Sequence, residues 1–127
     1  MARNDCQGRA QHPGVLHLYI HVMEMWPTPE EAIAAANVLS TLYPDAGQLR
    51  HMPEHIYVLC GHYSKVKKAS ESAIHADEAY AAYASPDSFQ VAMRCHDLHL
   101  MMSTCLFLGQ CEPTMAATDR MRTILPA

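Results

Sequence analysis

Nine of the 127 residues of this chain are histidine, and most of them recur at a spacing that could bind a metal ion. Six of them form three pairs, which are His17 and His21, His51 and His55, and His96 and His99. Because residues three or four apart lie on the same face of an α-helix, each pair would present two imidazoles on one side. Neutral imidazole is a common ligand for zinc, copper, nickel and iron.

We therefore predict that these six histidines are candidate ligands of a transition metal, zinc first, with copper, nickel or iron as alternatives. Glu24 follows His21 by three residues, on the same helix face. It is a candidate fourth ligand, or a catalytic general base acting on metal-bound water. The competing interpretation is that the histidines are polar groove residues, hydrogen-bonded to carboxylates or carbonyls, with no metal at all.

Two classes of function follow from this pattern. In the first, three protein ligands and an open position make a metal-dependent hydrolase that acts on a small substrate. In the second, a non-catalytic scaffold binds an extended or helical peptide, and the histidines tune its polarity or pH response. The sequence contains no Gly-rich phosphate loop, nucleophile elbow or HExxH motif, which removes the commonest enzyme classes.

The elements that must position these residues all read as helices. Apolar spacing and the placement of proline and glycine predict six of them: four over 13–25, 31–42, 50–60 and 63–83, a fifth that follows a restart at Ser85-Pro86-Asp87 and ends at Gly109, and a sixth over 113–125. Pro53 would lie within the first turn of the third helix, where its missing N–H does no harm, and Gly61 would end that helix. No segment reads as a strand, so the expected fold class is all-α.

Three inter-helix turns, at Pro27, Gly61 and Gly109, suggest a repeat. The first two lie 34 residues apart, and the third lags by an insertion of 14 residues. A 34-residue helical repeat is the tetratricopeptide period. Aligned on the turns, matching positions carry Met23, Tyr57 and Cys105; Ala32, Val66 and Thr114; Leu39, Ala73 and Met121; and Pro44 and Pro126.

Over about residues 13–126 the chain resembles the tetratricopeptide repeat (TPR) family, although the family's Leu-Gly pair early in the first helix is missing. The resemblance is closest to larger, mostly uncharacterised, His-rich bacterial TPR proteins. The segments that carry it are His12-Pro13-Gly14, His17, Ile20-His21, His51-Met52-Pro53, His55-Ile56-Tyr57 and His96 to His99. It implies antiparallel hairpins stacked as a short solenoid of about three repeats and six helices, with no established activity.

The histidines keep the register of this repeat. His17, His51 and His99 lie ten residues before their turns, whereas His21 and His55 lie six before theirs. In TPR proteins, the matching first-helix positions line the concave groove. The resemblance therefore implies that three neighbouring helices point histidines into one space.

Composition limits the partners and the compartment. The 9 Lys and Arg against 13 Asp and Glu form no basic block, which disfavours nucleic acid. No apolar run approaches the roughly 20 residues that span a bilayer, and the start lacks a signal-peptide core, so we expect a cytoplasmic protein without membrane contact. Residues 1–11 are polar and unpatterned, either disordered or an expression artefact, and one domain is expected over 12–127.

Three further expectations concern the surface. Lys65, Lys67 and Lys68 should form a solvated face of the fourth helix, with an acidic-peptide contact as the alternative. Asp77 and Glu78 should lie at a solvated helix end. Three hairpins without a polar capping helix would expose an apolar end face, so we expect a homo-oligomer that holds a small-molecule or peptide ligand in its groove.

Overall fold

The computed structural model describes residues 11–83 and 88–125, and over these ranges every regular element is a helix. The elements are α2 (Pro13–Glu24), the 3₁₀ helix η1 (Pro29–Ala32), α3 (Ile33–Leu39), α4 (Gly47–His51), α5 (Pro53–Leu59), α6 (Tyr63–Ala81), α7 (Ser88–Phe107) and α8 (Cys111–Ile124). Since η1 runs into α3 and α4 runs into α5, these correspond to the six predicted helices. The predicted all-α class is confirmed. The expectation for residues 1–11 falls almost wholly outside the described residues.

Pro53 acts differently from the prediction. The third helical segment begins at Gly47, about three residues before the predicted start at 50. Pro53 therefore lies beyond the first turn, where it has no N–H to donate to the preceding turn. The helix is interrupted at Met52 and resumes as α5. His51 and His55, which are four residues apart across this break, still lie on the same face.

Gly61 ends α5 as predicted. Its φ of 72° lies in the left-handed region that favours glycine. The His62 N–H donates to the Tyr57 carbonyl at 2.8 Å, and the Gly61 N–H donates to the Val58 carbonyl at 3.2 Å, which is the Schellman arrangement. The same pair of bonds follows α7 at Gly109, whose φ is 68°. Two of the three aligned turns thus have the same backbone geometry.

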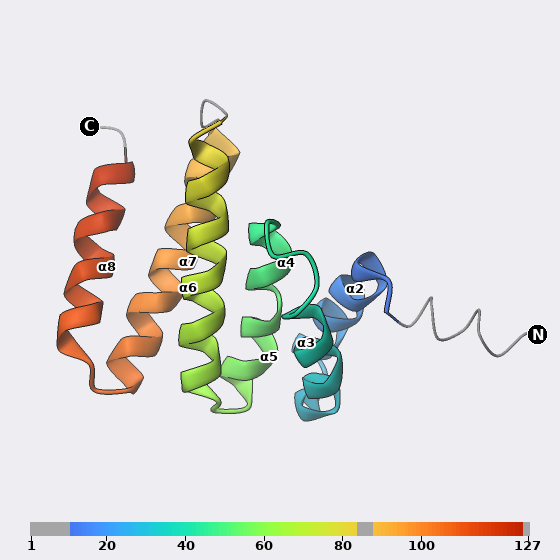
Figure 1. The fold of residues 1–127 in the computed structure, drawn as a ribbon. Helices are drawn as coiled ribbons and strands as arrows, with labels where there is room; N and C mark the ends of the chain where they lie inside the picture. The colour runs from blue at the N-terminus through green and yellow to red at the C-terminus, as the bar shows by residue number, and fades with distance from the viewer. Residues whose placement is uncertain (1–10, 84–87, 126–127) are drawn as a thin grey trace, which may run out of the picture.

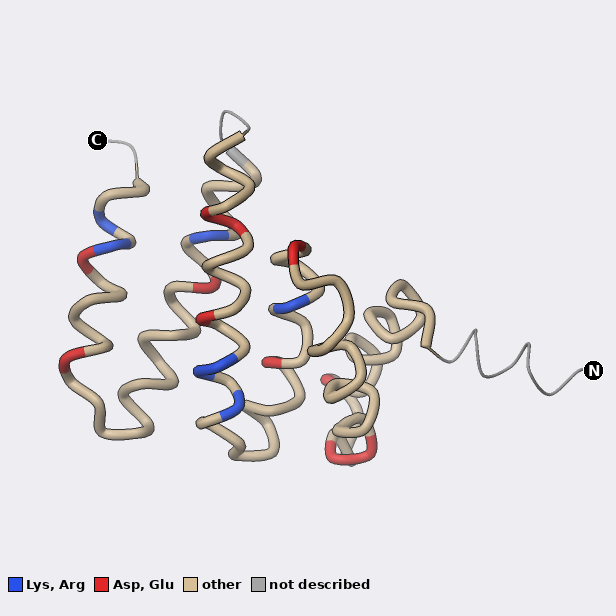
Figure 2. The backbone as a smooth tube through the Cα atoms, viewed as in Figure 1, with Lys and Arg blue, Asp and Glu red and all other residues tan. Residues whose placement is uncertain are grey.

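The helices follow one another across the molecule in chain order, as Figure 1 shows from α2 at one side to α8 at the other. The antiparallel neighbours α2 and α3, α5 and α6, and α7 and α8 pack against each other. Between these hairpins, α5 contacts both α2 and α3, and α6 contacts α7. Acidic and basic residues are interspersed along the helices rather than gathered in one block (Figure 2).

Apolar side chains form two separate clusters. The first joins α2, α3 and α5 through buried residues such as Ile20, Leu39 and Ile56, and the second centres on Ile74, Leu98 and Ala117. Fully burying a side chain of Ile or Leu size contributes about 1.5–3 kcal/mol. Methionines fill the space around the second cluster, namely Met101, Met102 and Met121.

Helix α6 reaches both clusters along one face. Val66 belongs to the first cluster and Ile74 to the second, while Ser70 lies halfway between them on the same buried stripe. A hydroxyl at that position requires a polar partner, because a buried unpaired polar group is costly. Among the described helices, none has the length and apolar character needed to cross a bilayer.

Candidate metal centre

Three histidine rings from α4, α5 and α7 converge on one point. The Nε2 atom of His51 lies 2.9 Å from Nε2 of His55 and 3.1 Å from Nε2 of His96. One ligand atom from each of the three residues lies within 4.8 Å of the others. Within the described residues, this is the group of histidine, cysteine and carboxylate side chains whose geometry could hold a metal ion.

The separations from His51 to the other two rings are close to those of a tetrahedral zinc site. Zn–N bonds of about 2.0–2.1 Å place two ligand nitrogens about 3.3 Å apart. The observed 2.9 and 3.1 Å from His51 Nε2 to the Nε2 atoms of His55 and His96 are slightly shorter, and the three ligand atoms together lie within 4.8 Å of one another. Two facing imidazole lone pairs repel one another unless a proton or a cation lies between them. A shared metal cation or a hydrogen bond from a protonated His51 therefore satisfies these contacts.

Carboxylates hold the opposite edge of two of these rings. His51 Nδ1 lies 3.0 Å from Asp97 Oδ1 and 3.6 Å from Glu54 Oε1, and His55 Nδ1 lies 2.8 Å from Glu24 Oε1. A carboxylate at Nδ1 favours the tautomer with its proton there, which leaves the Nε2 lone pair free to bind a metal. Carboxylate, histidine and metal commonly occur in this order in zinc proteins.

The acidic residues behind His51 lie deep in the fold. Glu54 is 0 % exposed and Asp97 is 1 % exposed. The Ser70 hydroxyl donates to Glu54 Oε2 at 2.7 Å, which supplies the polar partner that Ser70 requires. Glu54 Oε1 and Asp97 Oδ1 have no well-aligned hydrogen bond, so His51 is the cation that both of them face. Two buried carboxylates of this kind need a positive partner.

These neighbouring carboxylates and the burial of the site change the pKa values of the histidines. Burial alone lowers the pKa of an imidazole, but the contacts of His51 with Asp97 and Glu54 outweigh it and raise the pKa of His51 to about 9. Burial raises the pKa of Glu54 to about 6, against the opposing effect of His51. Burial, followed by the charge of His51, lowers the pKa of both His55 and His96. These two rings therefore favour the neutral form that metal ligands need, whereas a metal ion would have to displace the Nε2 proton of His51.

The predicted ligands His17 and His21 form a neighbouring pair. Their Nε2 atoms lie 3.0 Å apart, and the ring centres of His21 and His55 lie 5.9 Å apart. Glu24 stands between the two groups, because its Oε2 lies 3.6 Å from Nδ1 of His21 while its Oε1 contacts His55. Glu24 thus faces the Nδ1 edges of both rings, away from the Nε2 atoms that converge.

Helix α7, in the third hairpin, contributes a different histidine from the one that the repeat register predicted. His99 shares its register position with His51, yet the structure places His96 against His51 and leaves His99 exposed. The third turn lags the 34-residue period by 14 residues, so α7 does not keep the register of the first two hairpins. His96 was a predicted ligand through its spacing to His99.

Sequence reasoning did not identify the residues that support the rings. Glu54 follows His51 by three residues and Asp97 directly follows His96, and these short spacings were the available signal. Carboxylates are rarely buried, so these spacings alone do not predict that either side chain lies in the interior. Asp77 differs from its prediction in the same way. It is partly buried, and its carboxyl forms a hydrogen bond with Asp97.

Asp77→Asn should stabilise the chain at neutral pH. Burial, and then the nearby charge of Asp97, raises the pKa of Asp77 from 3.8 to about 6. Between these values the folded chain keeps a proton that the unfolded chain has released, so the free energy of unfolding falls as the pH rises. The neutral amide removes this penalty, and we expect a gain of about 1 kcal/mol at about pH 7, allowing for partial solvent screening.

Urea unfolding of wild type and variant across this pH window measures the effect. The wild type should lose stability as the pH rises, and Asp77→Asn should lose less. Asp45→Asn is the control, because Asp45 is exposed in the loop before α4. Equal slopes for wild type and Asp77→Asn would show that Asp77 is not protonated in the fold.

Comparisons with protein-family models, curated proteins and solved structures find no match for this chain. The geometry of the histidine cluster and its buried carboxylates is therefore the observation that bears on function.

Proposed function

We propose that this chain is a TPR-like helical repeat module that binds a zinc ion through Nε2 of His51, His55 and His96. The observation that carries the proposal is the convergence of these three nitrogens, with Nδ1 of two rings held by carboxylates. A protonated His51 would also place its Nε2–H against the other two rings, so metal content separates a zinc centre from a hydrogen-bonded cluster. The order of the hairpins and the two matching glycine turns support the TPR-like part.

Several features favour zinc among the transition metals. The cluster offers three imidazole nitrogens and no thiolate or thioether, which disfavours Cu(I). The carboxylates of Asp97 and Glu54 supply negative charge next to the site, which offsets the charge of a divalent cation. Ni²⁺ and Cu²⁺ accept the same ligands, so their affinities are a useful comparison with that of zinc.

The site is open on one side, which supports a hydrolytic role. His55 is 20 % exposed and His96 is exposed, so a fourth coordination position would face solvent. Zinc with three histidine ligands and an open position lowers the pKa of water to near 7 and polarises carbonyl groups. We propose a small substrate at that position. Glu24 acts here by positioning His55, because its carboxylate lies at the Nδ1 edge.

The alternative function is a non-catalytic scaffold that binds a peptide or a second copy of the chain. Exposed apolar side chains on α2 favour it, namely Val15, Leu18, Tyr19 and Val22. Contiguous exposed apolar surface often marks an interaction site. On this alternative the histidines bind no metal, so metal content separates the two functions.

Elemental analysis of protein purified without an affinity tag tests the zinc proposal. We expect about one zinc ion per chain, and its loss in His51→Ala and in His96→Ala. His17→Ala and His99→Ala are matched controls that should retain the metal, because neither residue belongs to the three-histidine cluster. Metal-free protein after purification in zinc-containing buffer would overturn the proposal. Equal loss in His17→Ala would show that the centre includes the His17 and His21 pair.

A further inference from the structure

A pocket with a volume of about 270 Å³ lies between α3, the α4 and α5 segment, and α6. It shares no residue with the histidine cluster. Its lining is Asn37, Ser40, Arg50, Tyr57, Lys65, Lys68, Ala69 and Ser72. The volume lies just below the range of about 300–1,000 Å³ that drug-sized ligands occupy, so it suits a smaller molecule.

The lining carries three cations and no acidic residue. Arg50, Lys65 and Lys68 meet there although the chain as a whole has a formal charge of −4. Within residues 11–83 and 88–125, none of the three forms an ion pair with a carboxylate. Figure 2 shows the basic segments of α4 and of the first half of α6 from which they come. The pocket is therefore positively charged and lacks an internal counter-ion.

Neutral neighbours hold two of these cations in place. Arg50 Nη1 donates to the Ser40 carbonyl at 2.6 Å, while its Nε is buried without a hydrogen-bond partner. Lys65 Nζ donates to Asn37 Oδ1 at 3.2 Å and lies 5.1 Å from the centre of the Tyr57 ring. These contacts orient both side chains at the pocket without neutralising their charge.

The remaining lining is uncharged. Tyr57 is 3 % exposed, and its hydroxyl donates to Asn37 Oδ1 at 2.8 Å, so its ring is held in place but presents little surface to a ligand. Asn37, Ser40 and Ser72 add polar groups. A ligand that fits the pocket has an anionic head and a small uncharged body.

We propose that this pocket binds a small phosphate monoester. A phosphate monoester dianion matches three cations better than a single carboxylate does, and its oxygens accept hydrogen bonds from guanidinium and ammonium groups. The ester substituent lies against the uncharged part of the lining. The assignment is independent of the zinc centre.

Phenyl phosphate is the probe, titrated calorimetrically into the full chain with EDTA present so that metal-bound phosphate does not contribute. We expect saturable binding to the wild type, about tenfold weaker binding in Lys68→Gln, and none in Lys65→Gln/Lys68→Gln. Both lysines are exposed, so these variants should fold. A circular dichroism spectrum like that of the wild type checks this.

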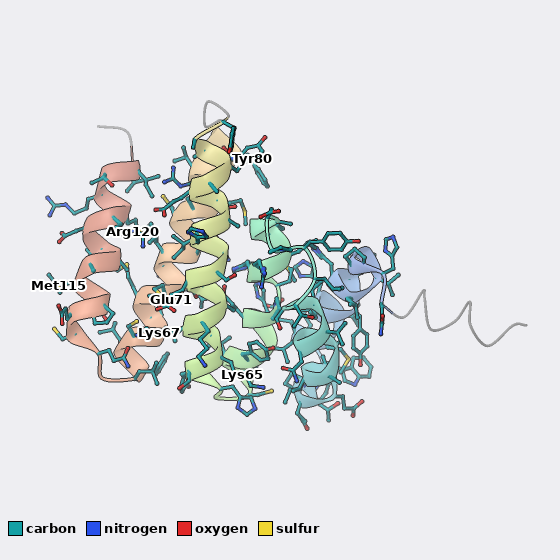
Figure 3. The ribbon with its side chains drawn as sticks, in the orientation of Figure 1. Lys65, Lys67, Glu71, Tyr80, Met115 and Arg120 are labelled. Atoms are coloured by element: carbon teal, nitrogen blue, oxygen red, sulfur yellow. The ribbon has the colours of Figure 1, made fainter. Side chains whose placement is uncertain are left out.

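Lys67→Gln is the matched control, because it removes the same charge from the same helix. Lys67 Nζ donates instead to Gln110 Oε1 at 2.6 Å, in the turn between α7 and α8. Figure 3 shows Lys67 on the side of α6 that faces α7, and Lys65 near the base of the helix. The affinity of Lys67→Gln for phenyl phosphate should equal that of the wild type. Equal weakening in Lys67→Gln, binding of phenol as tight as that of phenyl phosphate, or tighter binding of benzoate would overturn the proposal.

Discussion

Zinc should raise the midpoint of thermal unfolding by about 10 °C when free zinc exceeds its dissociation constant roughly a hundredfold. Binding to the folded state alone at that excess adds about 2.7 kcal/mol to the free energy of unfolding. The three Nε2 atoms of His51, His55 and His96 meet only in the folded chain, because the fold must bring His96 on α7 against His51 on α4. Zinc therefore favours the folded state strongly.

Differential scanning calorimetry with and without zinc measures this shift. His51→Ala and His96→Ala should abolish it, whereas His75→Ala should retain it, because His75 is exposed on α6 and outside the cluster. A smaller shift in His75→Ala would reveal that zinc also binds to histidines outside the cluster. A shift of the same size in His51→Ala would refute the three-histidine centre.

Asp97→Asn should weaken zinc binding by about 10–100-fold while leaving the three ligands in place. The carboxylate of Asp97 lies 3.0 Å from His51 Nδ1, where it fixes the ring and makes Nε2 more basic. An asparagine of nearly the same shape fills the space but lacks the charge. Competition with a fluorescent zinc chelator measures the affinity. Asp119→Asn, an exposed change on α8, is the control.

The same variant should change how the metal-free chain responds to pH. The folded pKa of His51, about 9, lies above its ordinary value of 6.5. The contribution of the protonated ring to stability is therefore fully present below pH 6.5 and is lost as the pH rises through 9. We expect the free energy of unfolding to fall on the order of 2 kcal/mol across this window in the wild type. Asp97→Asn should lose most of the slope, and an unchanged slope would contradict the ion pair.

The local features of this fold were predictable because short spacings determine them. Gly61 ends α5 with a positive φ, as its place after an apolar helix indicated. His51 and His55 share a face because they are four residues apart. Pro53 was also recognised, but its effect depended on where the helix began. That start was three residues earlier than expected, which turned a tolerated proline into an interruption.

The third ligand and the supporting carboxylates were not predictable in the same way. Whether His96 or His99 reaches His51 depends on how α7 packs against its neighbours, and no spacing within one helix determines that. The burial of Glu54 and Asp97 likewise results from the packing of three helices around them. Their sequence positions next to the histidines are compatible with both a solvated and a buried carboxylate.

The position of Ser70 between Val66 and Ile74 has a consequence for folding cooperativity. The two apolar clusters meet across α6 at a polar joint made by Ser70, Glu54 and the groups that they contact. The cooperative unfolding of the N-terminal and C-terminal hairpins should therefore depend on the charge balance at that joint. We expect the helices to unfold as one unit when a proton or a metal ion neutralises this joint, and α7 and α8 to open separately when neither does.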